Sequence, residues 1–132
     1  MCGIVGLLVK EPSLRERLGE LMTPMLIGMT SRGPDSAGVA IFGAPVKGNE
    51  RRVSLFWGEG EPAWKPLAQE LDEAFDSQPD LLVTGRHARL RTRLEPDELK
   101  AWFAQHAPQI YVLSVGRSID LYKDTGAPAD IV

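Results

Sequence analysis

The pattern of apolar and polar residues predicts short strands that alternate with amphipathic helices. Residues 2–9 form a nearly continuous apolar run with two glycines, which is typical of a buried strand. Over residues 14–29, leucines and methionines recur at spacings of three and four, which predicts a helix. Pro24 lies inside this pattern and is expected to kink or interrupt the helix. A turn at 31–36 then leads into a strand over 37–42.

The second part of the chain continues the alternation. Residues 47–52 are expected to form an exposed hairpin connection into a strand at 53–57. The further expected elements are a helix at 62–75, a strand at 81–85, a helix that opens at 95–98, a strand at 110–115, and a short strand followed by a Gly-Ala-Pro loop within 119–132. This order indicates an α+β chain, and the early hairpin favours antiparallel sheets over a doubly wound parallel sheet.

Length, composition and charge exclude several classes of function. The chain has 132 residues, of which 43% are hydrophobic and 25% charged, enough to bury the core of one domain at most. The net charge of −3 gives no reason to expect nucleic acid or a membrane surface as partner. The apolar start is too short to span a membrane and no basic segment precedes it. We expect a cytoplasmic protein.

The only cysteine, Cys2, directly follows the initiator Met1. Removal of Met1 would make Cys2 the N-terminal residue, with a thiol and a free α-amine on the same residue. The ordinary pKa of the amine is about 7.7–8.0 and that of the thiol about 8.5, so the amine can accept the thiol proton near neutral pH. Such a residue carries its own general base, and Cys2 is therefore our candidate nucleophile. A single cysteine also excludes an internal disulfide.

The second informative segment is residues 32–38, Arg-Gly-Pro-Asp-Ser-Ala-Gly. Taken alone it is ordinary turn chemistry with a surface ion pair. Together with Met-Cys-Gly-Ile-Val-Gly at residues 1–6, it resembles the class II glutamine amidotransferases. These begin with a processed Cys-Gly-Ile and carry an Arg-Gly-x-Asp-Ser-x-Gly turn at about this distance.

The resemblance implies an N-terminal-nucleophile hydrolase fold, an αββα sandwich of antiparallel sheets that is incomplete in this chain. Residues 1–132 would be the N-terminal part of one type-2 glutamine amidotransferase domain. It also implies that the Cys2 thiolate attacks the side-chain amide of glutamine and releases ammonia and glutamate. By the same resemblance, Arg32 supports Cys2, and Asp35 and Ser36 support Arg32 and the turn.

Residues 112–124 are similar to the amidotransferase subunits of the glutamate synthase-like and N-methylglutamate synthase-like type. This similarity implies a synthase subunit or domain that receives the ammonia. Two alternatives stay open. The chain could be the amidotransferase domain of a purine or amino-sugar pathway enzyme, or a truncated, non-catalytic partner domain.

The family's motifs for holding glutamine are missing from this sequence. There is no Gly-His-Thr-Arg and no Asn-Gly, and residues 84–89 hold similar residue types in a different order. No substrate-binding role is therefore assigned to Arg86 or Arg89. We expect the chain to be the N-terminal part of a longer amidotransferase.

The remaining candidates have plainer interpretations. His87 and His106 have no cysteine or clustered carboxylates at ligand spacing, so no metal site or cofactor is expected. The arginines of residues 86–93 are interpreted as a solvated or partner-facing strand edge. The three tryptophans are expected to pack in the core or at an interface.

Overall fold

The computed structural model describes residues 2–131. The chain divides into two compact units. One unit comprises Met1–Gly38 together with Lys123–Val132, and the other comprises Val39–Tyr122.

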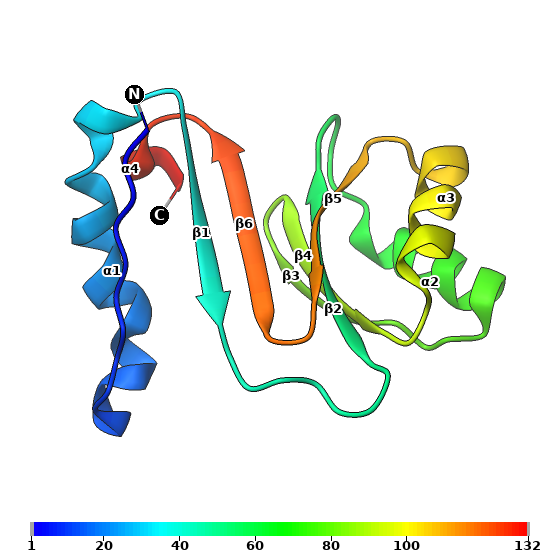
Figure 1. The fold of residues 1–132 in the computed structure, drawn as a ribbon. Coiled ribbons are helices and arrows are strands. Elements are labelled where there is room, and N and C mark those ends of the chain that lie inside the picture. Colours follow the sequence, from blue (N-terminus) through cyan, green and yellow to red (C-terminus); the bar gives the residue numbers. More distant parts are fainter. Residues whose placement is uncertain (1, 132) are drawn as a thin grey trace. The chain divides into compact units, whose positions relative to one another are not determined.

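The unit Val39–Tyr122 is built around a four-stranded antiparallel sheet. Its elements are, in chain order, β2 (Arg51–Trp57), α2 (Trp64–Phe75), β3 (Asp80–Thr84), β4 (His87–Thr92), α3 (Pro96–His106) and β5 (Ile110–Gly116). The strand order is β3-β4-β2-β5, and each neighbouring pair is antiparallel. This β-α-β-β-α-β arrangement is the split βαβ, or ferredoxin-like, topology. Helices α2 and α3 pack on the same face of the sheet (Figure 1).

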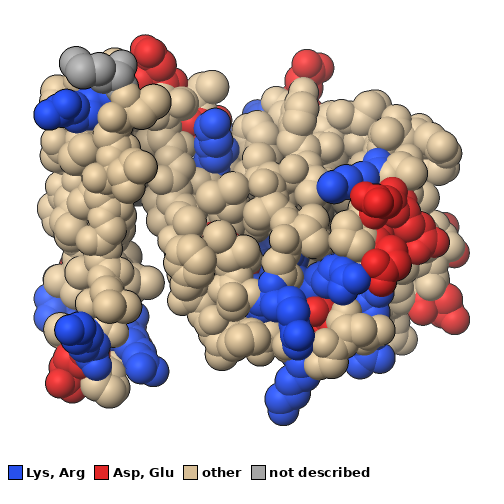
Figure 2. All heavy atoms as spheres, viewed as in Figure 1, with Lys and Arg blue, Asp and Glu red and all other residues tan. Residues whose placement is uncertain are grey.

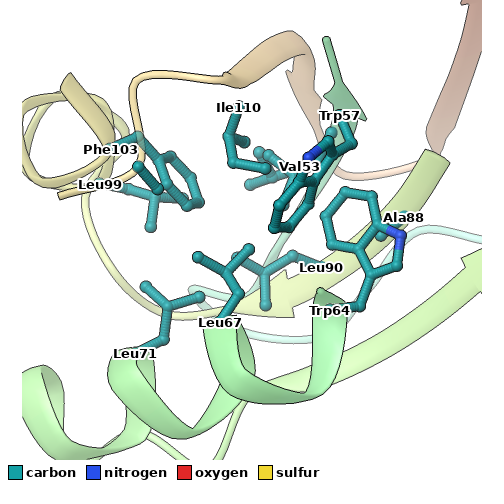
Figure 3. Close-up of a cluster of buried hydrophobic side chains, with 12 residues drawn as sticks. Val53, Trp57, Trp64, Leu67, Leu71, Ala88, Leu90, Leu99, Phe103 and Ile110 are labelled. Atoms are coloured by element: carbon teal, nitrogen blue, oxygen red, sulfur yellow. The ribbon is translucent and has the colours of Figure 1, made fainter. Parts of the chain in front are cut away.

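One face of the sheet and the two helices enclose a hydrophobic core (Figure 3). Val53, Leu55 and Trp57 of β2 are buried together because alternate side chains of a strand point to the same face. The helices contribute residues four positions apart, which lie on one helix face: Leu67 and Leu71 from α2, and Leu99 and Phe103 from α3. Burial of each such side chain contributes about 1.5–3 kcal/mol. The predicted helices at 62–75 and from 95, and the strands at 53–57 and 110–115, are confirmed.

Two of the three tryptophans lie in this core, as predicted. The rings of Trp57 and Trp64 meet edge to face with centroids 5.1 Å apart. Each indole N–H is satisfied by a backbone carbonyl, Trp57 by Glu59 at 2.7 Å and Trp64 by Gly85 at 2.9 Å. Trp102 is partly buried and packs against the core from α3. Hydrogen-bonded and buried, Trp57 and Trp64 are structural residues.

The basic stretch forms an interior strand, so its interpretation as a strand edge was wrong. β4 pairs with β3 on one side and with β2 on the other. The chain turns from β3 into β4 at Gly85, whose φ of 56° lies in the left-handed region that favours glycine. The sequence pattern missed this turn because the predicted strand at 81–85 ran directly into the arginines.

The strands before and after this sheet pair with each other. β1 (Ser36–Phe42) and β6 (Ile119–Thr125) form a separate two-stranded sheet. The predicted strand at 37–42 is therefore confirmed, but its hairpin with 53–57 was wrong. Two backbone hydrogen bonds close the gap between the outgoing and returning chain, from Gly43 N–H to the Ser118 carbonyl and from Val46 N–H to the Arg117 carbonyl, each at 2.8 Å. Residues 51–116 are thus inserted between two paired strands.

The other unit contains the N-terminal segment and short helices. Its helical elements are the 3₁₀-helix η1 (Pro12–Arg17), α1 (Leu18–Ile27), the 3₁₀-helix η2 (Thr30–Arg32) and α4 (Pro128–Ile131). The helix predicted at 14–29 is present, although its beginning is 3₁₀ and it continues through Pro24 to Ile27. The predicted loop at the end of the chain contains α4 instead.

Residues 2–9 do not form the buried strand that was predicted. The segment has no regular secondary structure, and Ile4 and Leu8 are 95% and 80% exposed. A strand requires a neighbour to satisfy its backbone groups, and no strand among the described residues pairs with this segment. An apolar run predicts a buried strand only where another strand can pair with it, and the pattern of residues 2–9 carries no information on such a partner.

The α+β class and the antiparallel sheets are confirmed. Among the helices of residues 2–131, none is long and apolar enough to cross a membrane.

Candidate functional site

The segment between α1 and β1 is a tight turn that places two side chains together. The Arg32 N–H donates to the Met29 carbonyl at 2.8 Å, and the Gly33 N–H donates to the Thr30 carbonyl at 3.3 Å. The Thr30 hydroxyl donates to the Ile27 carbonyl at 2.6 Å. In 3₁₀ geometry the side chains at positions i and i+3 eclipse each other, so Met29 and Arg32 face the same side.

The backbone of Gly3 lies directly against this pair. A β-carbon built on Gly3 would stand 2.7 Å from Cβ and 3.3 Å from Cγ of Arg32, and it would overlap the terminal methyl of Met29. Contacts below 3.0 Å are essentially never seen for real β-carbons. Only glycine fits at this position without a shift of one of these neighbours, and the backbone that directly follows Cys2 therefore packs against Arg32.

Cys2 itself has an exposed side chain and a free thiol. Arg32 ends η2 and is also exposed. The Gly3 contact thus places the segment that contains Cys2 against the turn that contains Arg32.

Asp35 and Ser36 follow the turn and lead into β1. The Asp35 carbonyl accepts the N–H of Gly126 at 2.9 Å, and Ser36 is the first residue of β1. Among the hydrogen bonds and ion pairs of residues 2–131, none joins the Arg32 side chain to Asp35 or Ser36. The support of Arg32 by these two residues stays a prediction, while the backbone of Asp35 ties the turn to the segment that follows β6.

Met29 was not predicted as a site residue. Its spacing from Met22 and Met25 assigned it to an apolar helix face, and nothing in that spacing indicates that the helix ends before it. In the sequence, only the glycine that follows Cys2 in the Cys-Gly-Ile motif points to a close contact at position 3.

Arg86 and Arg89, to which no substrate role was assigned, have structural partners in the unit Val39–Tyr122. Arg86 donates through Nε to the Trp57 carbonyl at 2.8 Å and lies over the Phe56 ring at 5.7 Å. Arg89 lies 3.4 Å from Asp120. Neither guanidinium group is therefore unpaired.

A polar cluster lies on the opposite face of the four-stranded sheet, away from the hydrophobic core. Asp120 of β6 is buried, and its Oδ2 accepts from Arg52 at 3.2 Å and Arg89 at 3.4 Å. The Ser54 hydroxyl oxygen accepts the N–H of Leu121 at 2.8 Å. These contacts attach the beginning of β6 to the sheet.

Tyr122 borders this cluster and packs on the His87 ring at 5.6 Å. Burial, and secondly the negative charge of Asp120, raise the pKa of Tyr122 above its ordinary value, against a smaller opposite effect of Arg89 and Arg52. The phenol is therefore kept neutral over a wider pH range than a free tyrosine.

Basic and acidic side chains adjoin one another on the viewed surface of this unit (Figure 2). Glu50 interacts with Arg91 at 3.2 Å and with Arg93 at 3.6 Å, and Arg51 with Glu95 at 2.8 Å. The arginines are thus neutralised locally and do not form an unbroken basic patch. Within the described part of the chain, no group of three or more His, Cys, Asp or Glu residues could hold a metal ion.

Comparison with known proteins gives two curated relatives. The chain is 37% identical over 135 residues to the glutamine amidotransferase-like protein GlxB of Rhizobium meliloti (strain 1021), and the match covers 100% of this chain and 44% of GlxB. A Methanothermobacter thermautotrophicus protein with the provisional name glutamine amidotransferase is 51% identical over 43 residues, 33% of this chain and 14% of that protein. No family model matches, and no solved structure matches significantly.

The chain spans less than half the length of GlxB. Its similarity to GlxB nevertheless extends over every part described above, from the Cys2 segment to the end of β6. The comparisons therefore support a relationship of this chain to the glutamine amidotransferase family.

Proposed function

We propose that the chain is the nucleophile-bearing part of a class II glutamine amidotransferase and that Cys2 performs the glutaminase half-reaction. The observation that carries this proposal is the 37% identity to a glutamine amidotransferase-like protein over the whole chain. The packing of Gly3 against Arg32 supports it, because it brings the two motifs of the resemblance together.

The reaction begins after Met1 has been removed. The α-amine of Cys2 takes the thiol proton, directly or through a water, and the thiolate forms a bond to the amide carbon of the glutamine side chain. The tetrahedral intermediate collapses with cleavage of the carbon–nitrogen bond, and the nitrogen accepts a proton and leaves as ammonia. Water then adds to the γ-glutamyl thioester and the carbon–sulfur bond breaks. Glutamate is released, and the thiol is regenerated with a proton from that water.

The exposed position of Cys2 is compatible with attack on an incoming amide. Arg32 is proposed to support the nucleophile from the side on which Gly3 packs, and Asp35 and Ser36 to hold the turn. An oxyanion hole is required as well, since loss of one donor typically costs about 2.7–4 kcal/mol in such reactions. No donor for it is assigned among the residues described here.

The proposal includes the N-terminal-nucleophile hydrolase sandwich as the fold of the complete enzyme, with residues 1–132 as the N-terminal part of that domain. The paired strands β1 and β6 are its proposed contribution from this chain. It also includes a synthase subunit or domain that consumes the ammonia, of the glutamate synthase-like or N-methylglutamate synthase-like type.

The test is glutaminase activity of the full-length protein, with intact mass to show the loss of Met1. We expect Cys2→Ala to reduce glutamate release by at least about a thousandfold, because no other nucleophile replaces the thiol. Glu16→Ala, an exposed change in the same unit, serves as a control and should keep the parent rate. Full activity of Cys2→Ala, or a mature protein that retains Met1, would contradict the proposal.

A further inference from the structure

We infer that Gly3 and Met29 are positioning residues for Cys2. Because Gly3 has no side chain, its backbone packs on Arg32 and on the methyl group of Met29, and this packing holds the nucleophile's backbone in place. The inference rests on the proposed function, because it concerns the placement of the proposed nucleophile. Neither residue contacts glutamine in this account, and both act through Cys2.

The first step of the argument is the rigidity of the surface on which Gly3 lies. The 2.8 Å hydrogen bond from Arg32 N–H to the Met29 carbonyl fixes the two side chains at neighbouring positions. The Cβ of Arg32 is attached directly to this backbone and cannot move away independently. The Met29 methyl is the far end of a flexible side chain and can.

The second step is the contrast with Gly6, which belongs to the same irregular segment. A β-carbon on Gly6 meets nothing within 4 Å, whereas one on Gly3 meets both Met29 and Arg32. Neither glycine is among the residues with positive φ. The requirement for glycine at position 3 is therefore one of space and not of backbone conformation.

It follows that Gly3→Ala must displace either the Cys2 backbone or the η2 turn. A displacement of about 1 Å at a reacting group can cost about 100-fold in rate. The thiol would remain exposed in such a variant, so its reaction with a small reagent that needs no bound orientation should hardly change.

The experiment compares Gly3→Ala with Gly6→Ala as the matched control, in the full-length protein. Each variant is treated with a diazo-ketone analogue of glutamine and, separately, with iodoacetamide. We expect Gly3→Ala to slow the reaction of Cys2 with the analogue roughly 10- to 100-fold, with iodoacetamide alkylation changed less than about twofold. Gly6→Ala should match the parent with both reagents. Met29→Ala in the parent background removes the methyl that packs on Gly3, and it should slow the reaction with the analogue less than Gly3→Ala does, with iodoacetamide alkylation again nearly unchanged.

The ¹³C-methyl NMR signal of Met29 provides a readout that does not depend on activity. It should move in Gly3→Ala and stay in place in Gly6→Ala. Equal analogue rates in the two alanine variants, or an unmoved Met29 signal, would overturn the inference. A parent protein that does not react with the analogue would instead count against the proposed function, and the methyl signal would still decide whether Gly3 contacts Met29.

Discussion

Asp120 joins the beginning of β6 to the four-stranded sheet through two arginines. Its side chain is 8% exposed, against 16% for Arg52 and 31% for Arg89. Its second oxygen, Oδ1, is buried and has no hydrogen-bond partner among the described residues. Since one oxygen carries both contacts, the attachment depends on the negative charge of the carboxylate as well as on geometry.

Asp120→Asn should therefore destabilise the unit Val39–Tyr122 by about 1.5–3 kcal/mol, the range for hydrogen bonds to charged groups. Asp80→Asn is the matched control, because its ion pair with Arg91 spans 3.9 Å and is exposed. That change should cost less than about 1 kcal/mol. Urea unfolding measures both, and equal losses in the two variants would show that Asp120 has no special role.

Tyr122 makes the stability of the same unit depend on pH. Its pKa is raised in the folded state, so its contribution is fully present below the unfolded value of 10.0 and is lost as the pH rises through the folded value. We expect the unfolding free energy to fall as the pH rises above about 10 by more in the parent than in Tyr122→Phe. Parallel pH profiles for the two proteins would contradict this assignment.

At the residue scale, the catalytic and supporting roles predicted from the sequence stay predictions. The resemblance brought Cys2 and Arg32 into one hypothesis, and the Gly3 contact places the two segments together. Met29 could not be predicted, because its role depends on where α1 ends and how the turn folds back. Apolar residues at spacings of three and four show neither where the helix ends nor how the following turn folds back.

At the scale of elements, the inserted sheet depends on a single contiguous core. Leu55 lies at its centre with an exposed fraction of 0%, between the helices and the neighbouring strands. Leu55→Ala is expected to cost about 2–5 kcal/mol through lost burial and an unfilled cavity.

Leu82 of β3 is 51% exposed and offers the matched change Leu82→Ala, which should stay within about 0.5 kcal/mol of the parent. Chemical unfolding followed by tryptophan fluorescence reports both variants, since Trp57 and Trp64 lie in the same core. A loss of unfolding free energy in Leu55→Ala as small as that in Leu82→Ala would contradict the central place of Leu55 in the core.

Most helices and strands of this unit could be predicted from the sequence because their apolar periods are clear and they pack on one another. The strand pairing could not be predicted. The hairpin expected between 37–42 and 53–57 was based on nearness in the sequence, whereas β1 pairs with β6, 77 or more positions later. Long-range pairing of this kind leaves no local pattern.

At the scale of the whole molecule, the chain combines a segment that carries the proposed nucleophile with an inserted ferredoxin-like unit. The four-stranded sheet and the hydrophobic core lie entirely within the unit Val39–Tyr122. The backbone hydrogen bonds of Gly43 and Val46 join the outgoing and returning chain within the same unit. Such a unit meets the usual description of a domain, which has its own hydrophobic core and ends close together.

A fragment of residues 39–122 is accordingly expected to fold alone, with a single cooperative thermal transition. The transition should respond to Leu55→Ala in the same direction as in the longer protein. A fragment with native-like far-ultraviolet circular dichroism but no cooperative transition would contradict this expectation.

The central claim is that Cys2 is the nucleophile of a glutaminase reaction. The most direct measurement is peptide mapping by mass spectrometry after the full-length protein has reacted with a diazo-ketone analogue of glutamine. We predict one adduct, on an N-terminal Cys2 that has lost Met1, which excess glutamine suppresses and Cys2→Ala abolishes. An unmodified Cys2 in a protein that still hydrolyses glutamine would contradict the account.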